Sequence, residues 1–337
     1  MAAGNTTPRL VSLGEVMIEL SAQAPLAEAA VLERSYSGDA LNVAVAVHRL
    51  GVPSAIVTRL GHDPFGDYLL AQFRGLGVDL RYVQRGGGPT GLYVVEQGGQ
   101  GAYDIWYYRR HSAASTVSRA DMEQVDLQGV DMVHLNGIAQ AISTSSRQAT
   151  RRLAERGRAA GATVAFDLNF RERIWDGPAA AEAADEILPL VDVALCGFDE
   201  GQTVFGTADP ESTATRLLEA GPRVAAVSMA EAGAYVAWGG GEIRLPTVAR
   251  TVQGAQGGGD AFAGGLAVGE LLGQNPATSA RLATVVAGLK VERVGPLVSL
   301  PFRAEVQARA AELGWDDVVA VLESVDPTPP ASQGADS

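Results

Sequence analysis

Residues 254–262 read GAQGGGDAF, and the apolar helical pattern AFAGGLAVGELLG (261–273) continues directly from them. Glycines let a backbone approach a ligand closely and turn its N–H groups inward. A helix that begins at about residue 258 would direct the positive end of its dipole to the same place. The stretch therefore predicts a loop that can hold an anion at the start of a helix.

Asp260 immediately follows the three glycines of this loop, Gly257, Gly258 and Gly259. Its carboxylate would lie beside the bound anion, where it could accept a proton from a hydroxyl that attacks a phosphoryl group. A flexible loop with Asp260 as a helix-start residue would have the same sequence. Both interpretations stay open on this stretch alone.

Outside this loop, short apolar runs alternate with amphipathic helical patterns. Strands are predicted at 10–20, 54–61, 132–138, 163–170, 191–198 and 223–229, and helices at 39–51, 64–77, 145–161, 179–191, 210–221, 260–273 and 279–295. Such alternation is typical of an α/β domain with a mostly parallel sheet covered by helices. We expect one domain over residues 9–324, with disordered tails at 1–8 and 325–337.

One segment, PTGLYVVEQGGQGAYDIWYYRRH (89–111), departs from this alternation. It has the pattern of a hairpin: a strand, a glycine-rich turn and an aromatic strand. Aromatic residues make up 6% of the chain, yet four of them are concentrated in the second half of this segment. The pattern predicts a small β-flap that projects from the main domain.

Composition excludes several classes of protein. The 337 residues are 47% hydrophobic and carry a net charge of −13, which argues against disorder and against nucleic-acid binding. Cys196 is the single cysteine, so no intramolecular disulfide can form, and we expect a cytoplasmic protein. We find no signal peptide and no apolar run long enough to span a membrane. The four histidines lack ligand spacing, which argues against a histidine metal site.

Candidate binding residues occur in two places. In YSGDALNVAVAVHRLG (36–51), Gly38 and Asp39 lie at a predicted helix start and Asn42 lies in its first turn. Asp39 and Asn42 could bind the hydroxyl groups of a polyol, although an Asp at such a position is often only a helix cap.

The second place combines YYRRHS (107–112) with FDLNFRERIW (166–175), which overlaps the end of the strand predicted at 163–170. A guanidinium binds a carboxylate or phosphate through two parallel hydrogen bonds. We expect Arg109 and Arg171 to contact a ligand, and their neighbours Arg110 and Arg173 to be solvated or paired with acidic residues. The carboxyl ends of parallel strands gather ligands in α/β folds, which supports this placement.

Taken together and in this order, these segments resemble the ribokinase-like (PfkB) carbohydrate kinases over about residues 10–309. Within that family they are most similar to 2-keto-3-deoxygluconate kinases. The segments that carry the resemblance are GEVMIEL (14–20), SGDALNVAVAVHRLG (37–51), TGLYVVE (90–96), WYYRRHSAAS (106–115), HLNGIA (134–139) and FDLNFRERIW (166–175). The resemblance implies a three-layer α/β/α sandwich with a mostly parallel sheet and a small β-lid from about 15–37 and 89–111.

The resemblance also implies a function, which is MgATP-dependent phosphorylation of a sugar-acid hydroxyl. Asp260 falls on the catalytic base, and Gly257 to Gly259 fall on an anion hole for the transferring phosphoryl group. The substrate side would comprise Gly38, Asp39, Asn42, Tyr93, Tyr107, Arg109 and Arg171. Glu200 falls on a residue that organises Mg²⁺, and the ATP side would include Ser228, Ala230 and Gly233. We also expect a homodimer or larger homo-oligomer formed through the β-lid.

The departures from the family pattern cluster on the ATP and Mg²⁺ side. Where the family usually has D-T-T before the glycines, this chain has Gly254, Ala255 and Gln256. Gly197 stands in place of an Asn, and Ser228-Met229-Ala230 stands where a Lys and a Gly are common. The substrate side is nearly intact.

Three interpretations follow. The first is a sugar-acid kinase with an altered nucleotide site, because Asp260, the glycines and Glu200 remain. The second is an enzyme that uses Asp260 as a general base for elimination or isomerisation without ATP. The third is a binding protein without catalysis, which would have no need of a base.

Overall fold

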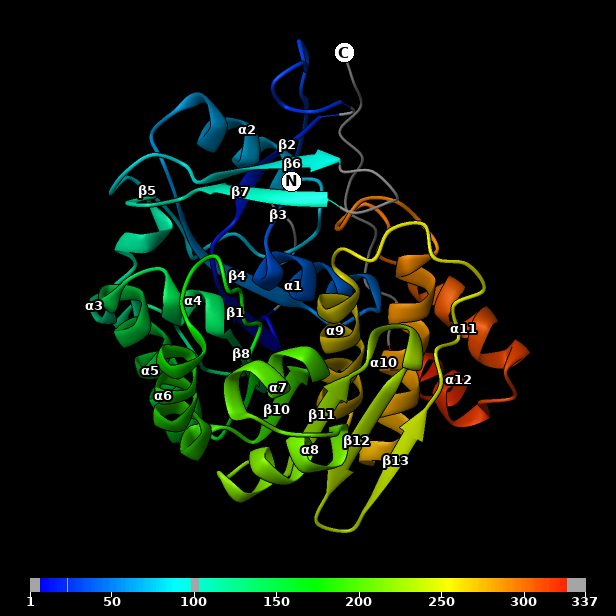
Figure 1. The fold of residues 1–337 in the computed structure, drawn as a ribbon. Coiled ribbons are helices and arrows are strands. Elements are labelled where there is room, and N and C mark those ends of the chain that lie inside the picture. Colours follow the sequence, from blue (N-terminus) through cyan, green and yellow to red (C-terminus); the bar gives the residue numbers. More distant parts are fainter. Residues whose placement is uncertain (1–6, 23, 98–102, 326–337) are drawn as a thin grey trace.

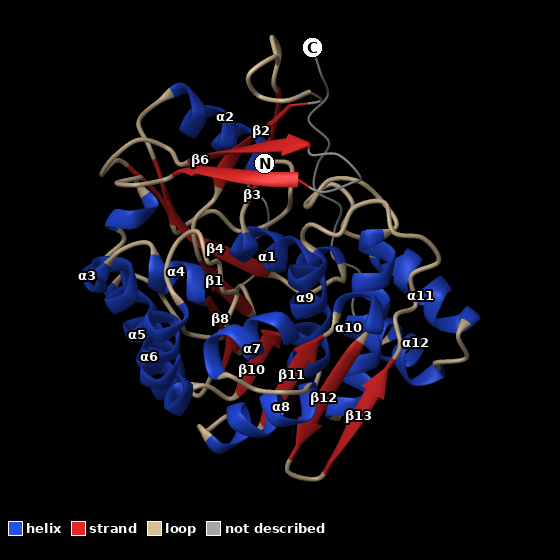
Figure 2. Cartoon of the chain, in the orientation of Figure 1, coloured by secondary structure: helices blue, strands red, loops and turns tan. Residues whose placement is uncertain are grey.

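The computed structural model describes residues 7–22, 24–97 and 103–325. Apart from Thr7, Pro8 and Val325, the predicted tails at 1–8 and 325–337 lie outside the described residues. Most of the glycine-rich turn of the predicted hairpin, 98–102, lies outside them as well. Within the described ranges the chain forms two sheets, and helices flank the larger one (Figures 1 and 2).

The larger sheet contains nine strands within the described residues: β1 (Leu10–Leu13), β4 (Ser54–Leu60), β5 (Val83–Arg85), β8 (Met132–Asn136), β9 (Thr163–Asp167), β10 (Val193–Gly197), β11 (Val224–Ser228), β12 (Ala234–Trp238) and β13 (Gly241–Leu245). Their order is β13-β12-β11-β10-β9-β8-β1-β4-β5. The strands from β11 to β5 in this order are parallel, and β12 and β13 add an antiparallel hairpin at one edge. The predicted mostly parallel sheet is confirmed.

Helices cover both faces of this sheet and give the predicted three layers (Figure 2). One face packs against α1 (Asp39–Arg49), α2 (Pro64–Phe73), α9 (Gly258–Leu271), α10 (Pro276–Val291), α11 (Arg303–Glu312) and α12 (Asp316–Glu323). The other face packs against α3 (Arg119–Glu123), α5 (Thr144–Ala159), α6 (Gly177–Ile187), α7 (Phe198–Phe205) and α8 (Pro210–Glu219). A short helix, α4 (Gly137–Ala141), follows β8 directly.

The two-residue period of the strands explains why both faces are covered. In β10, Ala194 packs into one core and its neighbour Leu195 into the other. Both faces are therefore apolar, as expected for strands in a parallel sheet with helices on each side.

The smaller sheet consists of β3 (Glu33–Ser37), β2 (Met17–Ala22), β6 (Leu92–Gln97) and β7 (Tyr103–Tyr108), in that order. In Figure 1 it lies across one end of the larger sheet, and we refer to these four strands as the β-lid. Its strands fall within the two ranges predicted for a lid. On one face of the β-lid, Met17, Tyr93 and Val95 form a small separate hydrophobic core.

The prediction of one strand over 10–20 was wrong, because this stretch divides between the two sheets. β1 ends at Leu13 and β2 begins at Met17. Gly14 stands between them, and a Cβ atom there would lie 2.7 Å from the Cβ of Ala40. The chain can therefore pass close to α1 as it crosses from the larger sheet into the β-lid.

Helix α9 packs closely against two neighbours through glycines. A Cβ at Gly264 would lie 2.5 Å from the Cβ of Ala46 in α1. A Cβ at Gly265 would lie 2.6 Å from the Cα of Ala283 in α10. This close packing brings the first turns of α1 and α9 together beneath the β-lid, where Asn42 and Asp260 meet.

Candidate active site

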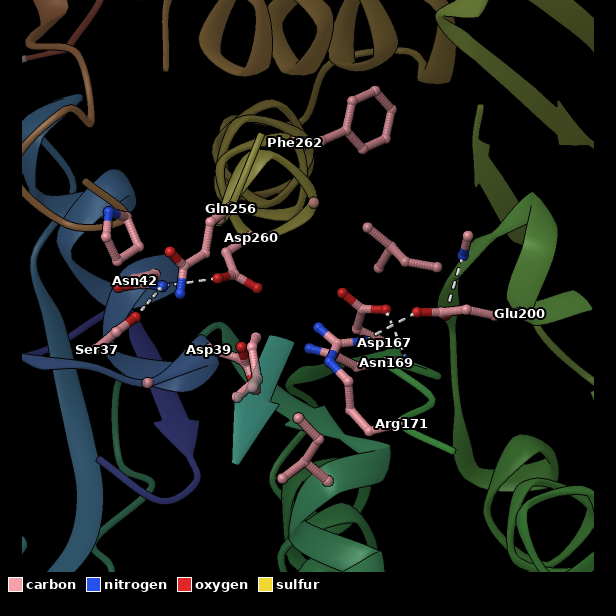
Figure 3. Close-up of a pocket in the computed structure, with 18 of the residues that line it drawn as sticks. Ser37, Asp39, Asn42, Asp167, Asn169, Arg171, Glu200, Gln256, Asp260 and Phe262 are labelled. Carbon is pink, nitrogen blue, oxygen red and sulfur yellow. Dashed lines mark hydrogen bonds and ion pairs between the residues drawn. The ribbon is translucent and has the colours of Figure 1, made fainter. Parts of the chain in front are cut away.

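A cavity of about 390 Å³ lies between the β-lid and the end of the larger sheet. Its walls come from the start of α1, the ends of β9, β10 and β11, the start of α9 and the inner face of the lid. Twelve of the predicted site residues line it: Gly38, Asp39, Asn42, Tyr93, Tyr107, Arg109, Arg171, Glu200, Ser228, Gly257, Gly259 and Asp260. Figure 3 shows Asp39, Asn42 and Asp260 on one side, facing Asp167, Arg171 and Glu200 on the other.

Asp260 lies in the first turn of α9 with 6% of its surface exposed. Its Oδ2 accepts a hydrogen bond of 2.7 Å from Nδ2 of Asn42, which also donates to Oγ of Ser37 at 3.1 Å (Figure 3). Because Asn42 is 1% exposed and held in α1, this contact fixes the orientation of the carboxylate.

The pKa of Asp260 is raised to about 7. Burial is the largest cause, and the nearby carboxylate of Asp39 raises it further. The hydrogen bond from Asn42 and the charges of Arg171 and Lys290 oppose this rise. A carboxylate with a pKa near 7 is well matched to proton transfer at neutral pH.

The three glycines before Asp260 have different surroundings. Gly257 has a φ of +80°, in the left-handed region that favours glycine, and it lines the cavity. A Cβ on Gly259 would meet no atom within 4 Å, so this residue borders open space. The N–H of Gly258 instead donates to the carbonyl of Ala255 at 3.0 Å, and Gly258 is not among the described lining residues.

The opposite wall holds one arginine among carboxylates. Asp167 ends β9, and Arg171 follows it in the next loop. Nη1 of Arg171 lies 3.3 Å from Oε1 of Glu200, which stands in the first turn of α7. Arg171 keeps 38% of its side-chain surface exposed, so its guanidinium is available to a ligand in the cavity.

Burial raises the pKa of both carboxyl groups on this wall. For Asp167 the causes are burial, then the charges of Glu200 and Asp260. For Glu200 burial dominates, and Arg171 opposes it. Burial acts to lower the pKa of Arg171, but the charges of Asp39, Glu200 and Asp260 raise it overall. Arg171 therefore stays charged and partly balances an acidic cavity.

Arg109 is already paired within the protein. Its Nε and Nη2 lie 2.8 and 2.5 Å from Oε2 of Glu15, and both side chains are buried. Arg109 Nη1 and Glu15 Oε1 have no hydrogen-bond partner among the described residues. Both residues line the cavity and can still bind a polar ligand. However, the carboxylate of Glu15 offsets the positive charge of Arg109, which we expected from the sequence to bind a substrate carboxylate.

We expect Arg109→Met to lower the free energy of unfolding by roughly 3–5 kcal/mol, because it leaves the buried Glu15 carboxylate without its partner. The double variant Arg109→Met/Glu15→Leu should recover most of this loss, since it removes both buried charges. Urea denaturation of the two variants and the unaltered chain measures the difference. Equal stability of the single and double variants would contradict this account.

The lid and the glycine loop are joined by Gln256. Its Nε2 lies 3.1 Å from Oε2 of Glu19 in β2 and 3.3 Å from Oη of Tyr93 in β6. The Tyr93 hydroxyl also donates to Glu19, and burial together with that carboxylate raises the pKa of Tyr93 well above its usual range. Gln256 is one of the residues that depart from the family pattern, and here it contacts the lid.

The predicted ATP-side residues lie around the end of β11. Ser228 lines the cavity, whereas Ala230 and Gly233 are not among the described residues that do. Ala230 has a φ of +48°, a left-handed conformation that is uncommon for a residue with a side chain. Gly233 passes so close to the end of β13 that a Cβ would lie 2.0 Å from the carbonyl oxygen of Leu245. Both positions therefore shape the loop that follows Ser228.

Sequence reasoning missed three charged residues near the cavity: Glu15, Glu19 and Lys290. Glu15 and Glu19 lie within GEVMIEL (14–20), and the alternation of that segment was a usable signal for a half-buried strand. Lys290 lies within a predicted helix, where nothing in the local pattern distinguishes a buried lysine from an exposed one.

Comparison with known sequences decides the family. Residues 7–303 match the description "pfkB family carbohydrate kinase". The chain belongs to this family. The PfkB resemblance seen in the sequence is thus confirmed.

Several relatives of this pfkB-family chain match it over most of its length. A 2-dehydro-3-deoxygluconokinase of Thermoproteus tenax is 33% identical over 88% of this chain and 93% of its own. A 2-dehydro-3-deoxygalactonokinase of Haloferax volcanii is 31% identical over 92% of this chain and 99% of its own. A crystal structure of a fructokinase with bound ATP from Xylella fastidiosa is 27% identical, covers 91% of this chain and 100% of its own, and has a TM-score of 0.82. None of these names supports the ATP-independent alternative.

The cavity of this pfkB-family chain fits a magnesium ion that arrives with a nucleotide. Mg²⁺ in phosphoryl-transfer sites is commonly held by one or two carboxylates plus phosphate oxygens and water. Asp167 and Glu200 are such carboxylates, and both line the cavity. Across the described residues, no group of three or more His, Cys, Asp or Glu side chains is placed to hold a metal unaided.

Proposed function

We propose that this protein is a sugar-acid kinase that transfers the γ-phosphate of ATP to a hydroxyl of a 2-keto-3-deoxygluconate-like substrate. The observation that carries the proposal is the position of Asp260. It lies at the start of α9 beside a glycine loop, with a pKa of about 7, and across the cavity from Arg171. The names of the relatives support the sugar-acid class.

In this mechanism the chain's own residues position the substrate and move one proton. Asp39 and Asn42 would bind substrate hydroxyls, and Arg171 would bind the carboxylate. Asp260 would accept the proton of the hydroxyl that attacks the γ-phosphorus. The N–H groups of Gly257 and Gly259 would stabilise charge on the transferring group. Mg²⁺ held by Asp167 and Glu200 would neutralise charge on the phosphates.

The direct test is transfer of phosphate to a defined acceptor. The purified chain is incubated with ATP, Mg²⁺ and 2-keto-3-deoxygluconate, and the products are followed by ³¹P NMR. We expect a sugar phosphate and ADP, with the neutral sugar fructose a much poorer acceptor. The absence of both phosphate transfer and calorimetric binding of MgATP would refute the proposal.

The pKa of Asp260 predicts the pH dependence of this reaction. The base must be ionised to accept a proton, and its pKa in the free enzyme is raised to about 7. We therefore expect kcat/KM to fall tenfold per pH unit below about pH 7 and to level off above it. A plateau that extends down to pH 5 would show that Asp260 is not the titrating base.

We further propose a homodimer formed through the β-lid and a cytoplasmic location. On β7, Trp106 is 45% exposed and Tyr108 is 64% exposed, and both lie on the outer face of the lid. Light scattering measures the oligomeric state, and a monomer would contradict the dimer. Among the described helices, none is long and apolar enough to cross a bilayer.

A further inference from the structure

Lys290 is the single lysine of the chain, and every other residue among the 26 lysines and arginines is an arginine. It lies in the last turn of α10 with 0% of its surface exposed. A buried lysine without a partner is costly, so its position requires an explanation. A lysine ammonium is a compact point charge on a flexible four-carbon stem, whereas a guanidinium is a planar fork of five N–H donors.

The ammonium of Lys290 holds the loop that leads into the three glycines. Its Nζ donates to the carbonyl oxygen of Gly254 at 2.9 Å. The N–H groups of Gln253 and Gly254 in turn donate to the carbonyl of Val291 at 2.8 and 3.1 Å. The loop is therefore attached to the C-terminal end of α10, where the helix dipole also favours a cation.

The absence of a side chain at Gly254 allows its contact with Lys290. A Cβ at this position would lie 3.0 Å from the carbonyl oxygen of Arg293 and 3.3 Å from the Cα of Val294. A glycine can lie this close to the chain that follows α10, which brings its carbonyl to Lys290. Within the described residues this carbonyl is the one hydrogen-bond acceptor of Nζ, although an ammonium has three N–H donors.

Lys290 is also electrostatically linked to the catalytic side of the cavity. The charges that act on it are the carboxylates of Asp260 in α9 and of Glu19 in β2. Burial lowers the pKa of Lys290 to about 8, and these two carboxylates oppose that change. In return, the ammonium lowers the pKa of Asp260. The other charged groups that act on Asp260 are the carboxylate of Asp39 and the guanidinium of Arg171.

We propose that Lys290 is a positioning residue of the phosphoryl-transfer site, which fixes the glycine loop through Gly254 and supplies the buried positive charge beneath the anion hole. This inference rests on the proposed kinase function. It gives the loop 254–260 a cation that its own sequence lacks. It also gives Lys290 two tasks, because the same ammonium lowers the pKa of Asp260 and attracts the phosphate that Asp260 faces.

The first test is the variant Lys290→Met, which keeps the length of the side chain and removes its charge. We expect kcat to fall about 10- to 100-fold with KM for the sugar acid changed less than threefold. We also expect the acid limb of kcat/KM to move above pH 7, because Asp260 loses a neighbouring cation. Arg281→Met is the matched control. Arg281 also lies on α10, but it pairs with Asp317 and does not line the cavity.

The shift of the acid limb separates this role from a merely structural one. A Lys290→Met variant with kcat within twofold of the unaltered chain would overturn the proposal. A fall in kcat with an unmoved acid limb would overturn it as well, because lost packing alone would explain that result.

A second measurement uses the unaltered chain and does not depend on the variant folding. Labelling with ¹³Cε-lysine gives one side-chain NMR signal, which reports the titration of Lys290 directly. We expect a pKa of about 8 that rises when MgATP or inorganic phosphate binds, since a nearby anion favours the charged ammonium. A lysine signal unmoved by MgATP in a chain that phosphorylates the sugar acid would overturn this inference alone.

A chain that transfers no phosphate would overturn the proposed function instead. The inorganic phosphate titration then decides the fate of the present inference. A response of the lysine signal would preserve Lys290 as the cation of an anion site, and the lack of one would remove that role too.

Discussion

Replacement of Asp260 by Asn is expected to lower kcat by about 10²- to 10⁴-fold while the fold is retained. An amide has nearly the shape of a carboxylate and can still accept the hydrogen bond from Asn42, but it cannot take up the proton of the attacking hydroxyl. Substrate binding should change little, because Asp260 acts on the reacting hydroxyl. Steady-state kinetics with ATP and the sugar acid measure kcat, and calorimetry measures binding.

The same variant should be more stable than the unaltered chain above neutral pH. The pKa of Asp260 is raised from 3.8 to about 7 by folding, so the folded state favours the protonated form. The raised pKa of Asp260 therefore stabilises the folded state below pH 4, where the carboxyl is protonated. This stabilisation is lost as the pH rises through 7 and the buried carboxyl ionises. Asn cannot ionise, so we expect a gain of roughly 1–3 kcal/mol at pH 8 and little gain at pH 4. A loss of activity together with a loss of stability at pH 8 would indicate misfolding and not a missing base.

The second large effect is expected for Arg171→Gln. Arg171 lies among Asp167, Glu200 and Asp39 and has 38% of its side chain open to the cavity. Removal of a charged hydrogen-bond partner costs about 1.5–3 kcal/mol, so KM for a sugar acid should rise about 10- to 100-fold. The remaining carboxylates would also repel an anionic substrate more strongly.

A neutral sugar that reacts slowly with the unaltered chain should lose much less than the sugar acid does. Arg173→Gln is the matched control, because Arg173 pairs with Asp104 and stacks on Trp106 outside the cavity lining. The ratio of kcat/KM for the two acceptors is the quantity to compare among the variants. Equal losses for acidic and neutral acceptors would show that Arg171 does not bind the carboxylate.

Local patterns predicted much of the fold because most elements are amphipathic or bounded by glycine. The start of α9 at Gly258 and the hairpin strands β6 and β7 fall where the sequence placed them. The hairpin β12–β13 was missed, although Gly239 and Gly240 separate the apolar run AYVAW from GEIRL, in which polar and apolar side chains alternate. The strand 10–20 was misjudged because apolar periodicity does not reveal where a chain leaves one sheet for another.

The pairing of charges could not be predicted, because it joins residues far apart in the chain. Arg109 is 94 residues from Glu15, and Gln256 is 237 residues from Glu19. The sequence identified Asp260 and Asn42 as candidates for different tasks, but only their 2.7 Å hydrogen bond makes them one unit. Ala230 illustrates a further limit, because its left-handed φ of +48° is set by the surrounding loop and not by its own preference.

Because three carboxyl groups with raised pKa values share one cavity, the binding of a cation there should be coupled to the release of protons. Asp167, Glu200 and Asp260 each hold on to a proton more tightly than an exposed carboxyl does. A divalent cation entering beside them would expel protons into the medium. The heat of nucleotide binding should therefore differ between phosphate and Tris buffers at one pH, because the two buffers take up a proton with different enthalpies.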